Sequence, residues 1–76
     1  MPKPPFPDLT QHVQDRMLQR GITEQDLRMA WWNQYEDRPG DYGSVWVCGW
    51  APGGRILKMC VTLPNRDTLI TAVWGS

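Results

Sequence analysis

Hydrophobic residues follow two different spacings along the 76-residue chain. Before residue 34 they recur every three to four positions, which is the period of an α-helix. After residue 43 they recur mostly at every second position, which is typical of β-strands. A polar stretch with Pro39, Gly40 and Gly43 separates the two parts and indicates an exposed loop. The pattern therefore predicts an α+β chain whose helices precede its strands.

Two helices are predicted in the first part. The first begins after Thr10, with Asp8 as an alternative start, and ends at Arg20 because Gly21 follows. The second begins after Thr23, where the letters "TEQD" have the form of a capping box, and ends near residue 33. The apolar positions that share one face of these helices are Leu9, Val13, Met17, Leu27, Ala30 and Trp31.

Three strands are predicted in the second part, at residues 44–50, 55–63 and 68–74. The turns between them, "PGG" and "PNRD", are short, so neighbouring strands are expected to be antiparallel. We therefore expect residues 10–76 to form one α+β domain, with two N-terminal helices packed on a three-stranded antiparallel meander. Residues 1–9 are expected to form an extended, proline-rich lead-in. The strand positions expected to face the helices include Leu57, Met59, Val61 and Leu63.

Three basic residues, His12, Arg16 and Arg20, are spaced four apart on the first predicted helix. With His12 as reference, Arg16 and Arg20 lie at about 40° and 80° around the helix axis, and the apolar Val13 and Met17 lie at about 100° and 140°. The basic row thus runs along the border of the apolar stripe. Two interpretations follow: cations that reach a cleft between helix and sheet, or side chains that cover the core and pair with acids.

Composition narrows the choices only slightly. The formal net charge is zero, so the total charge gives no sign of nucleic-acid binding. The chain contains neither the apolar core of a signal peptide nor the roughly 18 apolar residues of a membrane helix, so we expect a cytoplasmic protein without a membrane partner. Cys48 and Cys60 have no partnering histidines, which argues against a zinc site. Free buried thiols are expected, with a cross-strand disulfide as the alternative, and no metal or cofactor is predicted.

The stretch "LTQHVQDRMLQRGITEQDL" resembles the opening of a small bacterial domain family of unknown function. Members begin with the pattern Thr/Ser–x–His–Ala–x–x–Arg–Met–x–x–Arg–Gly–Ile–Ser/Thr and close with a threonine-containing strand similar to "LITAVW". The resemblance covers the chain from Thr10 to Trp74, and Val13 stands where the family usually has alanine. This family is in turn similar to the barnase and RelE-type ribonuclease toxins, whose helices also precede an antiparallel sheet.

The resemblance implies a metal-independent ribonuclease-like site between the first helix and the sheet. Carried over by position, its catalytic residues are His12, Arg16, Arg20 and Thr71. In the attack of a ribose 2′-hydroxyl on its own phosphate, His12 would act as acid or base, because histidine most readily exchanges a proton near neutral pH. Arg16 and Arg20 would hold phosphate oxygens. Thr71 would bond the phosphate or orient His12.

Lys58 and Tyr42 are added as substrate-binding residues for their chemistry rather than from the motif. Three tryptophans have the right chemistry to stack on a base, although core positions are the favoured interpretation: Trp46, Trp50 and Trp74. A ribonuclease toxin implies RNA as substrate and an antitoxin or immunity protein as partner. Two other functions stay open. One is a catalytically inert module that binds an acidic peptide or a phosphate through the basic row, and the other is a small structural protein.

Overall fold

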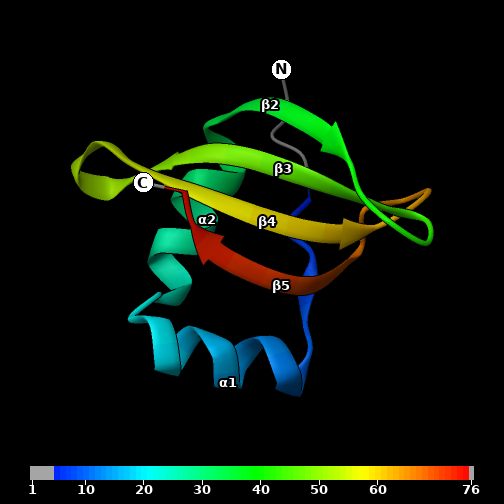
Figure 1. The fold of residues 1–76 in the computed structure, drawn as a ribbon. Helices are drawn as coiled ribbons and strands as arrows, with labels where there is room; N and C mark the ends of the chain where they lie inside the picture. The colour runs from blue at the N-terminus through cyan, green and yellow to red at the C-terminus, as the bar shows by residue number, and fades with distance from the viewer. Residues whose placement is uncertain (1–4, 76) are drawn as a thin grey trace.

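A mixed five-stranded sheet and two helices make up residues 5–75, the part of the chain that the computed structural model describes (Figure 1). The elements in chain order are β1 (Asp8–Leu9), α1 (Gln11–Arg20), α2 (Glu24–Trp32), β2 (Gln34–Pro39), β3 (Ser44–Ala51), a 3₁₀ turn (Pro52–Gly54), β4 (Arg55–Thr62) and β5 (Thr68–Trp74). The strand order is β1-β5-β4-β3-β2. β1 pairs with β5 in parallel, and the other neighbours are antiparallel.

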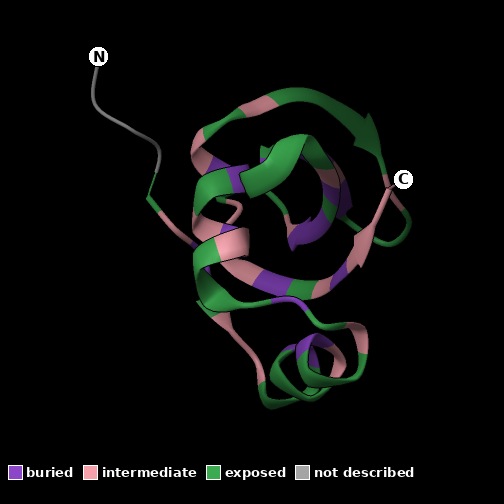
Figure 2. Ribbon diagram, turned by 90° about the vertical axis from the view of Figure 1, so that its left-hand side faces the viewer, coloured by how far each residue is buried: buried purple, intermediate pink, exposed green. Residues whose placement is uncertain are grey.

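The predicted three-stranded antiparallel meander is wrong, because the sheet has a further strand at each edge, although the α+β class holds. β2 occupies much of the segment predicted to be a loop. All of its residues after Gln34 are exposed, so this edge strand has no buried alternation (Figure 2). β1 lies in the expected lead-in and is only two residues long, and its partner strand is the last in the chain. Neither strand therefore leaves a hydrophobic pattern in the sequence.

The helix ends follow the predicted caps. The hydroxyl of Thr10 accepts a hydrogen bond from the Val13 amide at 3.1 Å, and Gly21 ends α1 with a φ of 66°. At the start of α2, Thr23 and Asp26 exchange side-chain-to-backbone bonds in a capping box. These bonds satisfy amides that have no partner inside a helix, which explains why both boundaries were visible in the sequence.

The core lies between α2 and one face of the sheet, with α1 beside β5 (Figures 1 and 2). As predicted, Leu57, Met59 and Val61 of β4 are fully buried there, but Leu63 follows β4 and is 46% exposed. Gly49 of β3 faces the same way, and a methyl group added to it would overlap the carbonyl oxygen of Ala30 in α2. The missing side chain is what lets α2 approach the sheet so closely.

The opposite side of the sheet, here called the open face, carries the alternate positions of the strands. Pairing places Trp46 beside Cys60 and Cys60 beside Thr71, in one row across β3, β4 and β5. In β5 the simple alternation is broken, because the register shifts between Cys60 and Val61. Leu69 and Thr71, which strict alternation would place on one side, therefore lie on opposite sides of the sheet.

Candidate functional site at the α1–β5 seam

Helix α1 lies along the outer edge of β5 and is bonded to it at both ends (Figure 1). At its start, the Thr10 hydroxyl donates to the Leu69 carbonyl at 3.4 Å. At its end, Nη1 of Arg20 donates to the Ala72 carbonyl at 2.8 Å, and Nε1 of Trp74 donates to the Arg20 carbonyl at 2.8 Å. These bonds use polar groups that the edge of the sheet would otherwise expose, and they fix the helix against the strand.

Arg20 and Thr71, two of the predicted site residues, meet at this seam, whereas the sequence analysis expected Thr71 to bond the phosphate or orient His12. Nη1 of Arg20 donates to Oγ1 of Thr71 at 3.3 Å. Both side chains are half-buried. Because Thr71 lies in the row of Trp46, Cys60 and Thr71 on the open face, Arg20 lies at the edge of that face.

Arg16 and His12 continue the basic row along α1, away from Thr71. Arg16 is half-buried and donates to Oε1 of Gln19 at 3.2 Å. His12 is exposed, and no hydrogen bond or ion pair involves its side chain within residues 5–75. Arg20 comes eight positions after His12, roughly 12 Å along the helix axis. The structure thus joins Arg20 to Thr71 directly and leaves His12 about two turns away.

The charges of the row are not neutralised locally. Across the described part of the chain, the ion pairs join Arg28 to Glu24, Arg38 to Glu36 and Arg66 to Asp37. None of them includes Arg16 or Arg20, whose side-chain hydrogen-bond partners are neutral oxygens. Both guanidinium groups therefore keep their charge for an anion.

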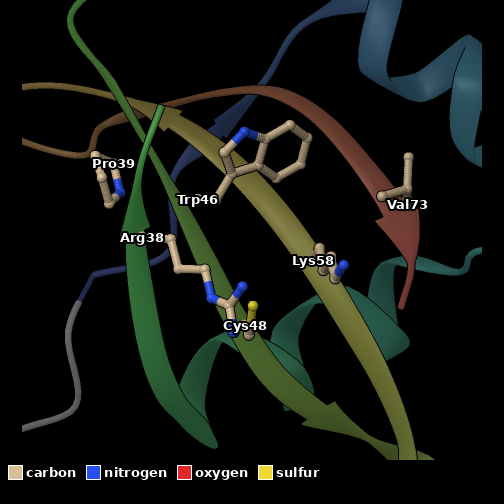
Figure 3. A pocket seen from close by; sticks show the side chains of 6 residues that line it. All are labelled: Arg38, Pro39, Trp46, Cys48, Lys58 and Val73. Atoms are coloured by element: carbon tan, nitrogen blue, oxygen red, sulfur yellow. The ribbon is translucent and has the colours of Figure 1, made fainter. Parts of the chain in front are cut away.

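Lys58 lies elsewhere, on the open face, where it lines a hollow of about 340 Å³ (Figure 3). The six residues around this hollow come from β2, β3, β4 and β5: Arg38, Pro39, Trp46, Cys48, Lys58 and Val73. Figure 3 shows Arg38 extending from β2 towards Cys48, with the Trp46 ring at the other side of the hollow. Arg38 was missed in the sequence because it lies in the segment predicted to be a loop.

Tyr42 does not join either group. It lies in the loop between β2 and β3, has a φ of 55° and is completely exposed. Of the other tryptophans considered for base stacking, Trp50 stacks on Tyr35 at 5.1 Å between ring centroids. The Trp74 ring is covered by the guanidinium of Arg55 at 3.5 Å. Trp46 is the one of the three that lines the hollow.

Cys48 and Cys60 are free and buried, as predicted. Within residues 5–75, no group of three or more His, Cys, Asp or Glu side chains is close enough to hold a metal ion. In the same residues, no helix is both long and apolar enough to cross a membrane.

Fold and site together define a small α+β domain whose basic helix borders the open face of a sheet. Residues 9–74 match the family model described as a domain of unknown function, DUF4258, and the chain belongs to that family. The predicted membership of a small domain family of unknown function is thereby confirmed. No curated protein and no solved structure shows significant similarity to the chain.

Proposed function

We propose that this domain is a metal-independent ribonuclease of the toxin type, with its site at the α1–β5 seam. The observation that carries the proposal is the hydrogen bond between Arg20 and Thr71. These two residues are 51 positions apart in the sequence, and both belong to the pattern of the small domain family, which in turn resembles ribonuclease toxins. Their contact brings a cation of α1 beside a hydroxyl of β5, where one phosphate can reach both.

Cleavage at this site needs only side-chain chemistry. The 2′-hydroxyl of a ribose attacks the adjacent phosphorus, a new O–P bond forms, and the bond to the 5′-oxygen of the next nucleotide breaks. His12 takes the proton of the 2′-hydroxyl and then returns one to the leaving oxygen. Arg16, about one turn from His12, stabilises the extra negative charge on the phosphate oxygens during the attack, and Arg20, about two turns from His12, holds an adjacent phosphate of the strand. Thr71 holds the Arg20 guanidinium in position.

The surroundings of the row support these roles. A guanidinium without a carboxylate partner can bind a phosphate without first breaking an ion pair, and Arg16 and Arg20 have no such partner within the described residues. His12 is exposed and next to Arg16 on the helix surface, since residues four apart are neighbours there. An incoming RNA strand therefore meets a proton carrier and two cations along one side of α1.

The test is cleavage of a fluorescently labelled single-stranded RNA by the purified protein and by His12→Ala. We expect cleavage to fall about 100-fold or more in the variant, the usual contribution of a general acid or base. The products should carry a 2′,3′-cyclic phosphate, and a chelator should not change the rate. Gln14→Ala, an exposed change on the same helix outside the row, serves as the control. Equal rates for the protein and His12→Ala would contradict the proposal.

The toxin character has its own readout in cells. Expression of the protein in the bacterial cytoplasm, without a partner, should arrest growth, and His12→Ala should relieve the arrest. An antitoxin or immunity protein is the expected partner, because a free ribonuclease would damage the cell that makes it. If cells that contain active enzyme grow normally, the proposed ribonuclease activity would stand, but the proposed role as a toxin would be contradicted.

A binding module without catalysis is the second candidate, favoured by the surroundings of His12. Within residues 5–75, no hydrogen bond orients its imidazole, and no second acid–base side chain is bonded to it. Such a module would bind an acidic peptide or a phosphate group, such as that of RNA, through the basic row without cleaving it. Binding of RNA that stays intact after long incubation would favour this candidate over the ribonuclease.

A further inference from the structure

The hollow on the open face is a second feature that the seam does not explain. One row across the sheet runs from Arg38 through Trp46 and Cys60 to Thr71. Because Arg20 bonds Thr71, this row ends at the seam. Neighbouring strands are about 4.8 Å apart, so β3 lies roughly 10 Å from β5. The hollow and the seam are therefore adjacent parts of one surface.

The lining of the hollow combines an aromatic ring with cations. Its volume of about 340 Å³ lies in the range of small-ligand sites, roughly 300–1,000 Å³. Trp46 is half-buried, so its position is supported by neighbours while part of the ring remains accessible. Cys48 and Val73 add apolar surface on either side of Lys58, since both pair with it across the strands. An apolar surface with cations beside it can bind a ligand that has a flat aromatic ring and an attached anionic group.

The cations of the hollow are available to such an anion. Lys58 is exposed, and the ion pairs found in residues 5–75 do not include it. Arg38 does pair with Glu36, at 3.3 Å, but the two side chains are 69% and 41% exposed. An ion pair so open to water is weak and is readily exchanged for a phosphate. Arg38, Lys58 and Glu36 together carry a net positive charge.

We propose that the hollow binds one unpaired nucleotide of single-stranded RNA, with its base on Trp46 and its phosphate between Lys58 and Arg38. The proposal rests on the proposed function for the identity of the polymer, and it places the nucleotide next to the one whose phosphate reaches Arg20. A base inside a duplex cannot enter the hollow, because its faces are covered by its neighbours. The site thus selects single strands.

Binding is measured separately from cleavage with a short 2′-O-methyl RNA, which lacks the attacking hydroxyl and stays intact. Fluorescence anisotropy of the labelled oligonucleotide gives the affinity for the full chain. We expect Trp46→Leu to weaken binding roughly 5- to 150-fold, the range of one lost base–aromatic stack. Trp46→Phe keeps a ring and should retain most of the affinity. Because Trp46 is half-buried, the melting temperature of both variants is measured alongside.

Lys58→Gln tests the phosphate contact. It should weaken binding, and it should reduce the slope of log affinity against log salt concentration by about 0.7, the value for one phosphate contact on a single strand. Arg28→Gln is the matched control, because it removes the same charge from α2, outside the open face. It should leave both affinity and slope close to those of the unchanged protein.

The outcomes separate the hollow from the seam. Loss of binding with Trp46→Leu and Lys58→Gln, with retention in Trp46→Phe and Arg28→Gln, supports the nucleotide site even if the protein proves unable to cleave RNA. If Trp46→Leu and Lys58→Gln bind RNA as the unchanged protein does, while Arg16→Ala loses binding, the nucleotide site in the hollow is contradicted. The proposed ribonuclease site on α1 is then unaffected. Equal affinity for a duplex of the same sequence also overturns it.

Discussion

Arg20 has a structural role beside the chemical role proposed for it. Its backbone carbonyl accepts the indole N–H of Trp74, and its guanidinium donates to the Ala72 carbonyl and the Thr71 hydroxyl. The two arginines of the basic row therefore differ in their contacts. Arg20 holds the end of α1 on β5, whereas the Arg16 side chain, within residues 5–75, bonds only to Gln19 on its own helix.

We expect Arg20→Ala to lower the free energy of unfolding by about 1–3 kcal/mol, because a charge-assisted bond to a strand carbonyl is lost. Arg16→Ala should change it by less than about 0.5 kcal/mol, as for most surface substitutions. Urea unfolding of both variants measures the difference. Similar losses for the two arginines would show that α1 is not fixed at its C-terminal end as described.

How far the sequence predicted the site depended on the range of each contact. Thr10 and Gly21 cap a helix through neighbours, so their roles were visible in a short stretch. The resemblance to a family motif named both Arg20 and Thr71, but it did not predict their contact, because no spacing rule links residues so far apart. Tyr42, chosen for its chemistry alone, lies at a loop tip outside both surfaces.

Among the secondary-structure elements, β3 and β4 were the most predictable, since their buried alternation follows directly from the sequence. Edge strands gave no such signal. β2 contains Glu36, Asp37 and Arg38, all exposed, and ends at Pro39, a residue that edge strands tolerate. The register shift in β5 also has no local mark, because it arises from the pairing with β4.

The closeness of α2 and β3 gives a prediction for Gly49. Gly49→Ala should destabilise the fold by at least about 1–3 kcal/mol, because the added methyl group meets the Ala30 backbone, which cannot move as a side chain can. Thermal unfolding measures the effect. Lys58→Ala, in the neighbouring strand but on the open face, is the control and should change stability by less than about 0.5 kcal/mol. A Gly49→Ala variant as stable as this control would mean that α2 lies farther from the sheet.

Taken as a whole, the molecule distributes its charge in a way that the zero net charge conceals. In the part of the chain that the structure describes, Arg16 and Arg20 have no carboxylate partner, while acids of α2, β2 and the β4–β5 turn are bonded to nearby side chains. Total charge governs long-range attraction, but a phosphate responds to the few groups within hydrogen-bond reach. A neutral chain is thus compatible with a local RNA site.

The chain is also small, and a domain of this size buries only about 60% of the surface of its unfolded form. Residues 5–9, part of the predicted extended lead-in, therefore contribute to the stability of the fold. The carbonyl of Pro5 accepts the indole N–H of the buried Trp31 at 2.8 Å. Phe6 packs against the core beneath the guanidinium of Arg28, and β1 adds a strand to β5.

A variant that begins at residue 10 should accordingly be much less stable than the full chain, because it loses β1 and uncovers Trp31. Phe6→Ala alone should cost roughly 1–3 kcal/mol, less than the about 3–5 kcal/mol of a fully buried phenylalanine, since Phe6 is only half-buried. Urea unfolding of both, beside a variant without residues 1–4, assigns the loss to residues 5–9. If the variant that begins at residue 10 unfolded at the same urea concentration as the full chain, the N-terminal segment would be a passive extension after all.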